Sequence, residues 1–124
     1  MPITHPLNFH VGWTLVLVGF LCGALIGLGF HRESFLGGYA SFPRRLLRLG
    51  HIALVALGAF NVLFSLCPLP APGAWNAPWV SKLWLVGAVA MPAVCFLSAW
   101  KHSFRHLFFI PVASLIGAVV LILL

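Results

Sequence analysis

Residues 44–54 read Arg-Arg-Leu-Leu-Arg-Leu-Gly-His-Ile-Ala-Leu, and they join a basic loop to a long hydrophobic run. Arginines gathered in this way mark the point where a hydrophobic segment meets the membrane surface. His51 is the clearest polar exception inside the run, about two helical turns after Arg44. The stretch therefore predicts a membrane boundary and a candidate functional side chain close to it.

The composition of the whole chain supports a membrane protein. Of its 124 residues, 62% are hydrophobic and only 6% are charged, whereas a soluble domain carries about 25% charged residues. A surface this apolar would aggregate in water. The length is enough for about four spanning helices of roughly 20 residues each, which leaves nothing for a separate soluble domain.

We therefore predict an all-α integral membrane protein, an antiparallel bundle of four transmembrane helices that forms a single transmembrane domain over residues 1–124. The chain reads as four apolar segments separated by polar or proline-rich loops. Pro43 fits the first turn of the second helix, where its missing N–H costs nothing. The predicted spans are residues 10–30, 44–66, 80–100 and 107–124.

The basic residues predict the orientation of this bundle. Six of the seven Lys and Arg residues fall in or beside the first and third loops, and Lys82 alone falls on the other side. By the positive-inside rule, both termini face outward and the two basic loops face the cytoplasm. We expect the chain in a bacterial inner (cytoplasmic) membrane, in contact with the lipid bilayer through these basic ends and not with nucleic acid.

Three glycines of the first segment share one helix face. Gly19, Gly23 and Gly27 stand at i, i+4 and i+8, a spacing that lets another helix approach closely in lipid. One interpretation is internal packing against the second or third segment. The sharper alternative is a contact with another membrane protein subunit through this glycine face.

Two polar features lie inside later segments. Asn61 needs a hydrogen-bond partner in hydrocarbon, so we expect its side chain to face other helices. Pro92 frees a backbone carbonyl within the third segment and predicts a kink. Neighbouring helices or the hydroxyl of Ser98 are the candidates to compensate for that lost hydrogen bond.

Six histidines accompany a single acidic residue, Glu33. His31, His51 and His106 fall near one membrane level on three different segments, and axial imidazoles from two helices can hold a haem b between them. His51 with His106 or His31 is the predicted ligand pair, and Arg45 and Arg48 are candidates to contact haem propionates or lipid. The structural alternative for His51 is a hydrogen bond to a backbone carbonyl.

Other chemistries find little support in the sequence. The three cysteines form no CxxC or CxxCH motif, so neither a zinc site nor covalently attached haem is indicated, and we assign no metal ligands. No catalytic residues stand out, and we expect no enzymatic activity from this chain alone. A small transporter or channel is disfavoured because the only acid lies in a loop.

These observations leave three hypotheses in order. The first is a small accessory subunit of a larger electron-transfer or photosynthetic membrane complex, which stabilises subunit packing and holds a cofactor, quinone, pigment or lipid in addition. The second is a b-type haem cytochrome with His51 as an axial ligand. The third is a small transporter or channel.

Overall fold

The computed structural model describes residues 2–68 and 76–124. Over these residues the chain is helical and contains four helices that are long and apolar enough to cross a membrane. The long helices are α1 (Pro6–Phe30), α2 (Phe42–Leu66), α3 (Ala77–Trp100) and α4 (Phe109–Leu123). Two short 3₁₀ helices accompany them, η1 (Phe35–Gly37) and η2 (His102–Phe108). The all-helical prediction is confirmed.

Helices α1, α2 and α3 begin a few residues earlier than the sequence pattern suggested. Proline occupies the first turn of α1, α2 and α3, where a fixed φ and a missing N–H favour helix initiation. The hydroxyl of Ser41 also accepts a hydrogen bond from the backbone N–H of Arg44 and caps α2. The fourth predicted span instead begins as η2 and continues as α4, because η2 holds the turn between α3 and α4.

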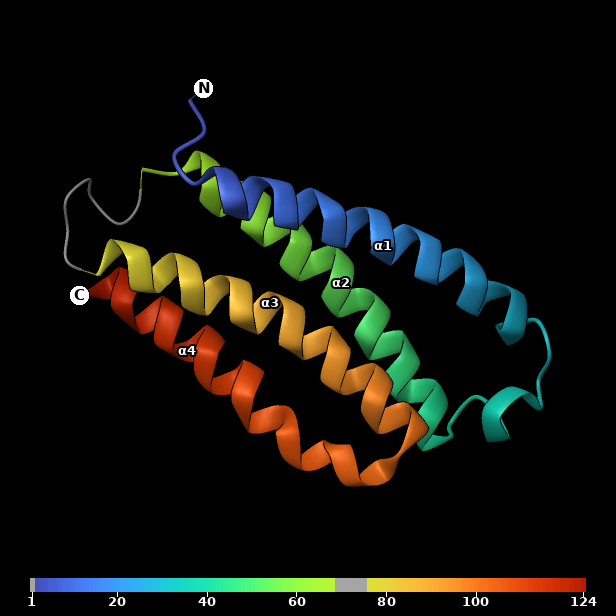
Figure 1. Cartoon of the computed structure of the whole chain (residues 1–124). Helices are drawn as coiled ribbons and strands as arrows, with labels where there is room; N and C mark the ends of the chain where they lie inside the picture. The colour runs from blue at the N-terminus through green and yellow to red at the C-terminus, as the bar shows by residue number, and fades with distance from the viewer. Residues whose placement is uncertain (1, 69–75) are drawn as a thin grey trace.

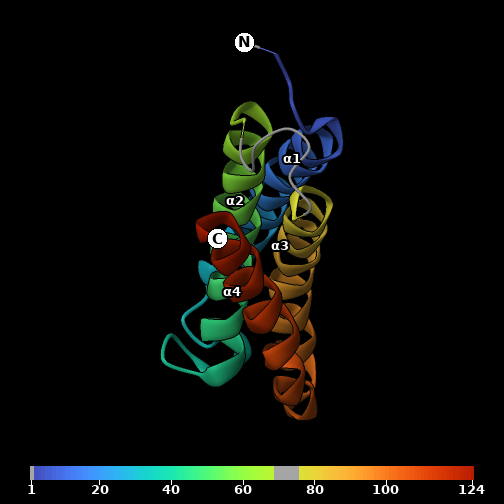
Figure 2. The ribbon, with the colours of Figure 1, turned by 90° about the vertical axis from the view of Figure 1, so that its left-hand side faces the viewer.

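The four helices are antiparallel and lie in a row (Figure 1). Helix α1 packs on α2, α2 on α3, and α3 on α4, while α1 touches α3 only slightly. In the described part of the chain, α4 has no packed interface with α1 or α2. In the view turned by 90°, α4 lies nearest the viewer and overlaps α2 and α3, with α1 behind them (Figure 2). The array is therefore open rather than a closed four-helix bundle.

Each neighbouring pair of helices is held close by a glycine. Gly58 of α2 lies against the backbone of Gly12 in α1, Gly50 lies against Phe96 of α3, and Gly87 lies against Leu115 of α4. Because lipid is as apolar as the side chains, close van der Waals contact rather than hydrophobic burial holds such pairs together. The central buried cluster joins α1, α2 and α3 through Leu15, Leu54 and Ala88.

Candidate functional site

The His51 side chain lies between α1 and α2. Its Nδ1 atom is 2.9 Å from the backbone oxygen of Gly19, and its ring lies over the backbone of Gly23. A carbonyl oxygen can only accept a hydrogen bond, so the pairing assigns the proton of a neutral ring to Nδ1 and leaves the lone pair on Nε2. The hydrogen bond to a carbonyl, which was the structural alternative for this residue, is present.

The three glycines assigned to the packing face of α1 have different surroundings. A Cβ atom on Gly19 would lie 2.6 Å from Val55 Cγ2, and one on Gly23 would lie 2.6 Å from His51 Cε1. Both positions therefore pack internally against α2, as the first interpretation of this face required. A Cβ atom on Gly27 would meet nothing within 4 Å. Of the three, Gly27 alone has room beside it for an added Cβ atom.

That open space is a pocket of about 310 Å³ between α1 and α2. His51 and Arg48 supply its polar groups, and Phe30 forms part of its apolar wall. The remaining lining residues are Gly23, Ile26, Gly27 and Ile52. A pocket with mostly apolar walls and a few placed polar groups is the usual form of a small-molecule site.

The arginines of the opening stretch have separate roles. Arg44 is buried, and its guanidinium donates to the backbone oxygens of Phe30 and Glu33, each at 3.0 Å. It also lies over the Phe30 ring, 4.3 Å from the centroid. Arg44 therefore caps the C-terminal end of α1. Arg45 is exposed and does not line the pocket.

Arg48 is the arginine that borders the pocket. It donates one hydrogen bond of 3.2 Å to the backbone oxygen of Tyr39 and lies 4.1 Å from the centroid of the Tyr39 ring. A guanidinium has five N–H donors, so this contact leaves other donors for a ligand. Arg48 precedes His51 by three residues, which places both side chains on one face of α2.

The other candidate haem ligands lie apart from this pocket. His31 is exposed and follows α1, about 12 Å beyond Gly23 at 1.5 Å per residue. His106 is exposed on η2, which packs against α3 and α4. Neither lines the pocket. The structure thus describes His51 as a single imidazole at its site, without His31 or His106 as its neighbour there.

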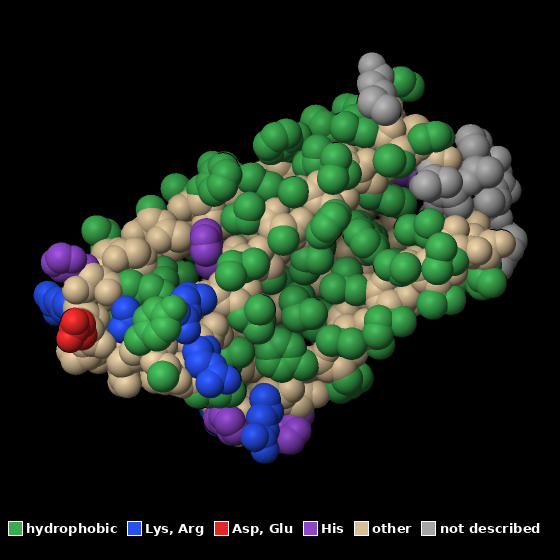
Figure 3. Space-filling model, turned by 180° about the vertical axis from the view of Figure 1, so that it is seen from behind, with side chains coloured by type: hydrophobic (Ala, Val, Ile, Leu, Met, Phe, Trp, Pro, Cys, Tyr) green, Lys and Arg blue, Asp and Glu red, His purple; other side chains and the backbone are tan. Residues whose placement is uncertain are grey.

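His31, His102 and His106 nevertheless lie at the same end of the molecule as most of the Lys and Arg residues. Figure 3 shows blue and purple side chains gathered there, while hydrophobic side chains cover most of the visible face. At this end Arg105 Nη1 lies 2.7 Å from His102 Nε2, and the His102 ring lies 4.7 Å from the Phe42 ring. Within residues 2–68 and 76–124, no group of three or more His, Cys, Asp and Glu side chains could hold a metal ion.

A buried polar network lies toward the opposite end of the helices. Asn8 Nδ2 donates to Asn61 Oδ1 at 2.9 Å, and Asn61 Nδ2 donates to the Leu57 backbone oxygen at 2.9 Å. Ser81 of α3 donates its hydroxyl hydrogen to Asn8 Oδ1. Asn61 therefore faces other helices, as predicted. Sequence reasoning missed Asn8 and Ser81, because each stands near a helix start, where polar residues are common.

Ser98 does not compensate for Pro92. Its hydroxyl is buried and has no hydrogen-bond partner among the described residues. Helix α3 nevertheless continues through Pro92 from Ala77 to Trp100. Packing against α2 on one side and α4 on the other therefore holds this helix together across the proline.

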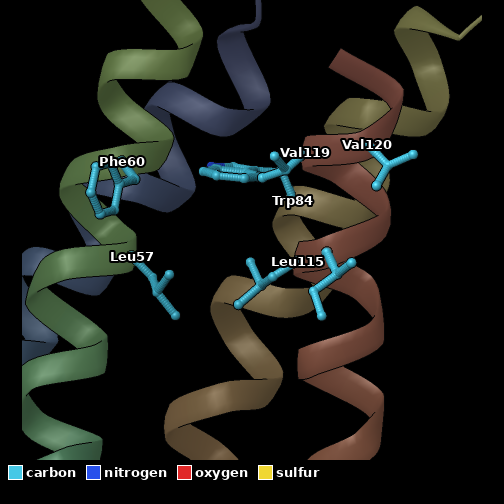
Figure 4. Close-up of a pocket in the computed structure, with 7 residues that line it drawn as sticks. Leu57, Phe60, Trp84, Leu115, Val119 and Val120 are labelled. Atoms are coloured by element: carbon cyan, nitrogen blue, oxygen red, sulfur yellow. The ribbon is translucent and has the colours of Figure 1, made fainter. Parts of the chain in front are cut away.

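A second pocket lies on the flank of the array, between α2 and α4 (Figure 4). Trp84 of α3 forms its floor, Phe60 stands on the α2 side, and Val119 stands on the α4 side. The other lining residues are Leu57, Leu115, Ile116 and Val120. This groove has a volume of about 360 Å³ and only hydrophobic walls.

Comparisons with protein-family models, with curated proteins and with solved structures found no match for this chain.

Proposed function

We propose that this protein is a small accessory subunit of a larger membrane complex of the electron-transfer or photosynthetic class, and that it stabilises the packing of that complex. The observation that carries the proposal is the open row of helices. Among the long helices of the described residues, α4 has its packed interface with α3, and the apolar groove beside it, about 360 Å³ in volume, offers space for side chains of another helix.

The groove also has raised rims and a recessed floor, into which the side chains of a docking helix can interdigitate. Phe60, Ile116 and Val119 are 53%, 59% and 43% exposed along its rims, while the Trp84 ring closes its floor. Association of helices in lipid depends on interdigitated van der Waals packing, and a ridged groove offers more of it than a smooth helix face. We therefore place the partner, an apolar transmembrane helix of a different subunit, in the groove between α2 and α4.

The groove between α2 and α4 is a different docking site from the α1 face with Gly19, Gly23 and Gly27, which the sequence suggested for a partner subunit. Helix α2 already covers Gly19 and Gly23, so a partner helix cannot approach the backbone there. The proposed membrane is a bacterial inner membrane, with the basic end at the cytoplasmic side. The positive-inside distribution of Lys and Arg supports that orientation.

The substitution Val119→Trp tests the assembly. A large ring on α4 should fill the groove and reduce the partner that co-purifies in mild detergent by at least about tenfold, which corresponds to about 1.4 kcal/mol. The measurement is quantitative mass spectrometry of complexes excised from a native gel. The control is Leu28→Trp, because Leu28 is 77% exposed on α1 and far from the groove in the row. Equal co-purification of the two variants would contradict the proposed docking site.

A b-type haem protein is the second candidate function, and the His51 tautomer favours it. Histidines that bind metal usually donate the other ring N–H to a carbonyl or carboxylate, and Nδ1 of His51 pairs with the Gly19 oxygen in this way. The remaining lone pair on Nε2 would be the iron ligand, and Arg48 would be the partner of a propionate.

A reduced-minus-oxidised visible spectrum of the gently purified protein tests this candidate. If the protein binds haem b through His51, we expect a Soret band in the wild type. The band should be lost in His51→Leu, while the helical content stays the same. A flat spectrum from the wild type, or full haem retention in His51→Leu, would remove His51 as an axial ligand.

A further inference from the structure

The pocket between α1 and α2 is lined by two complementary polar side chains, His51 and Arg48, and by Gly27. His51 lines the pocket, and its Nδ1 bond to the Gly19 oxygen leaves Nε2 as an acceptor; Arg48 also lines the pocket and keeps guanidinium donors beyond the one on the Tyr39 oxygen. Gly27 lines the same pocket, and a Cβ atom there would meet nothing within 4 Å. A ligand that satisfies the pocket must therefore donate one hydrogen bond, accept another and be narrow and apolar between them.

Gly27 gives independent support for a ligand at this position. Glycine is a poor helix former, and Gly12, Gly19 and Gly23 are accounted for by their contacts with α2. No atom of the described protein accounts for Gly27, because a Cβ atom there would meet nothing within 4 Å. A flat ring laid on the helix backbone would use the space that a side chain at this position would fill.

We infer that this pocket binds the ring of a lipid-soluble quinol, with one ring hydroxyl donating to His51 Nε2 and the opposite ring oxygen accepting from Arg48. The ring lies over Gly27, and the apolar tail leaves past Ile26 and Ile52 toward lipid. The volume of about 310 Å³ falls at the lower end of the range of about 300–1,000 Å³ for small-molecule sites. This inference concerns binding by the isolated chain and does not depend on the partner subunit.

The hydrogen-bond pattern distinguishes the quinol from other membrane amphiphiles. The oxidised quinone has only acceptor oxygens, so it satisfies Arg48 but leaves Nε2 of His51 without a donor. The phosphate and ester oxygens of an anionic phospholipid also only accept, so a phospholipid would need a headgroup hydroxyl or ammonium group to donate to His51. A haem would compete for the same nitrogen, but no second imidazole lines the pocket.

The test is a binding measurement on the full chain in mild detergent. Decylubiquinol kept under argon is incubated with the protein, free ligand is removed by gel filtration, and retained ligand is quantified by chromatography. We expect saturation near one decylubiquinol per chain and binding of decylubiquinone that is at least about fivefold weaker. Equal affinity for the two forms would overturn the assignment of the quinol hydroxyl to His51.

Gly27→Leu and Ala24→Leu form the decisive pair of variants. Both add the same side chain to α1, but Gly27 borders the pocket and Ala24 is exposed without lining it. Gly27→Leu should lower retained decylubiquinol at least about tenfold, without lowering the thermal unfolding midpoint, whereas Ala24→Leu should bind as the wild type does. Equal retention by the two variants would mean partition into the micelle and would overturn the site.

Two further measurements address His51 and the competing occupants. His51→Phe removes the acceptor and should weaken decylubiquinol binding about tenfold, with Gly27→Leu as the safeguard if this variant fails to fold. Native mass spectrometry of the wild type then identifies what decylubiquinol displaces. A phospholipid that resists displacement, or a haem whose Soret band disappears in His51→Leu, would overturn the quinol assignment.

Discussion

Gly12→Leu is expected to cost about 3 kcal/mol or more of stability, since overpacking at a rigid contact leaves the structure little room to adjust. A Cβ atom at this position would lie 2.7 Å from the backbone oxygen of Gly58 and 2.9 Å from Val62 Cγ2. The same contact appears from the other side, because a Cβ atom on Gly58 would lie 2.8 Å from the Gly12 oxygen. A leucine would therefore force α1 and α2 apart along their shared length.

Circular dichroism during titration of the detergent-solubilised protein with SDS measures this effect. Gly27→Leu is the matched control, because it makes the same change on the same helix in a place with open space. Its unfolding midpoint should stay at or above that of the wild type, since leucine forms helices better than glycine by about 1 kcal/mol at most. Similar losses in both variants would show that the close contact at Gly12 is not what joins α1 to α2.

Asn61→Leu should lower stability by about 2–3 kcal/mol. Asn61 and Asn8 are both 0% exposed and hydrogen-bond to one another. Interhelical hydrogen bonds in membranes contribute only about 0.6 kcal/mol on average and about 1.7 at most. The larger expected cost arises because the substitution leaves the buried amide of Asn8 without a partner for one N–H group, which adds about 1–3 kcal/mol.

The double variant with Asn8→Leu and Asn61→Leu separates these two contributions. It removes both amides, so it should cost less than the sum of the single substitutions, as expected for directly bonded residues. Thr14→Val serves as the control, because Thr14 is exposed and donates only to His10 within its own helix. A change beyond about 0.5 kcal/mol there would be unusual for a surface position. Strict additivity of the asparagine substitutions would contradict a direct bond between the two side chains.

The two pockets assign different tasks to different faces of one small protein. The apolar groove between α2 and α4 is proposed to receive a partner helix, and the polar pocket between α1 and α2 is proposed to bind a quinol. They lie on different helix pairs, so a variant in one pocket should leave the task of the other unchanged. Val119→Trp can therefore serve as a control in the quinol-binding measurement, and Gly27→Leu can serve as a control in the co-purification measurement.

The amino-acid sequence by itself determined the number of helices and their approximate ends. Hydrophobic runs of more than about 20 residues, punctuated by proline and charged loops, have few alternatives to a membrane-spanning helix. The same local reasoning identified the need of Asn61 for a partner and singled out His51, because an isolated polar group in hydrocarbon is costly.

Only the tertiary structure decided which faces of the helices meet. Apolar residues occur on every face of α1, so its sequence carries no amphipathic signal to orient it, and lipid supplies no contrast that would add one. The choice of Gly12, Gly19 and Gly23 for contact, with Gly27 left open, depends on the rotation of α1 against α2. The partners of Asn61 and the open row of helices depend likewise on contacts between segments distant in the chain, where shape rather than hydrophobicity determines the pairing.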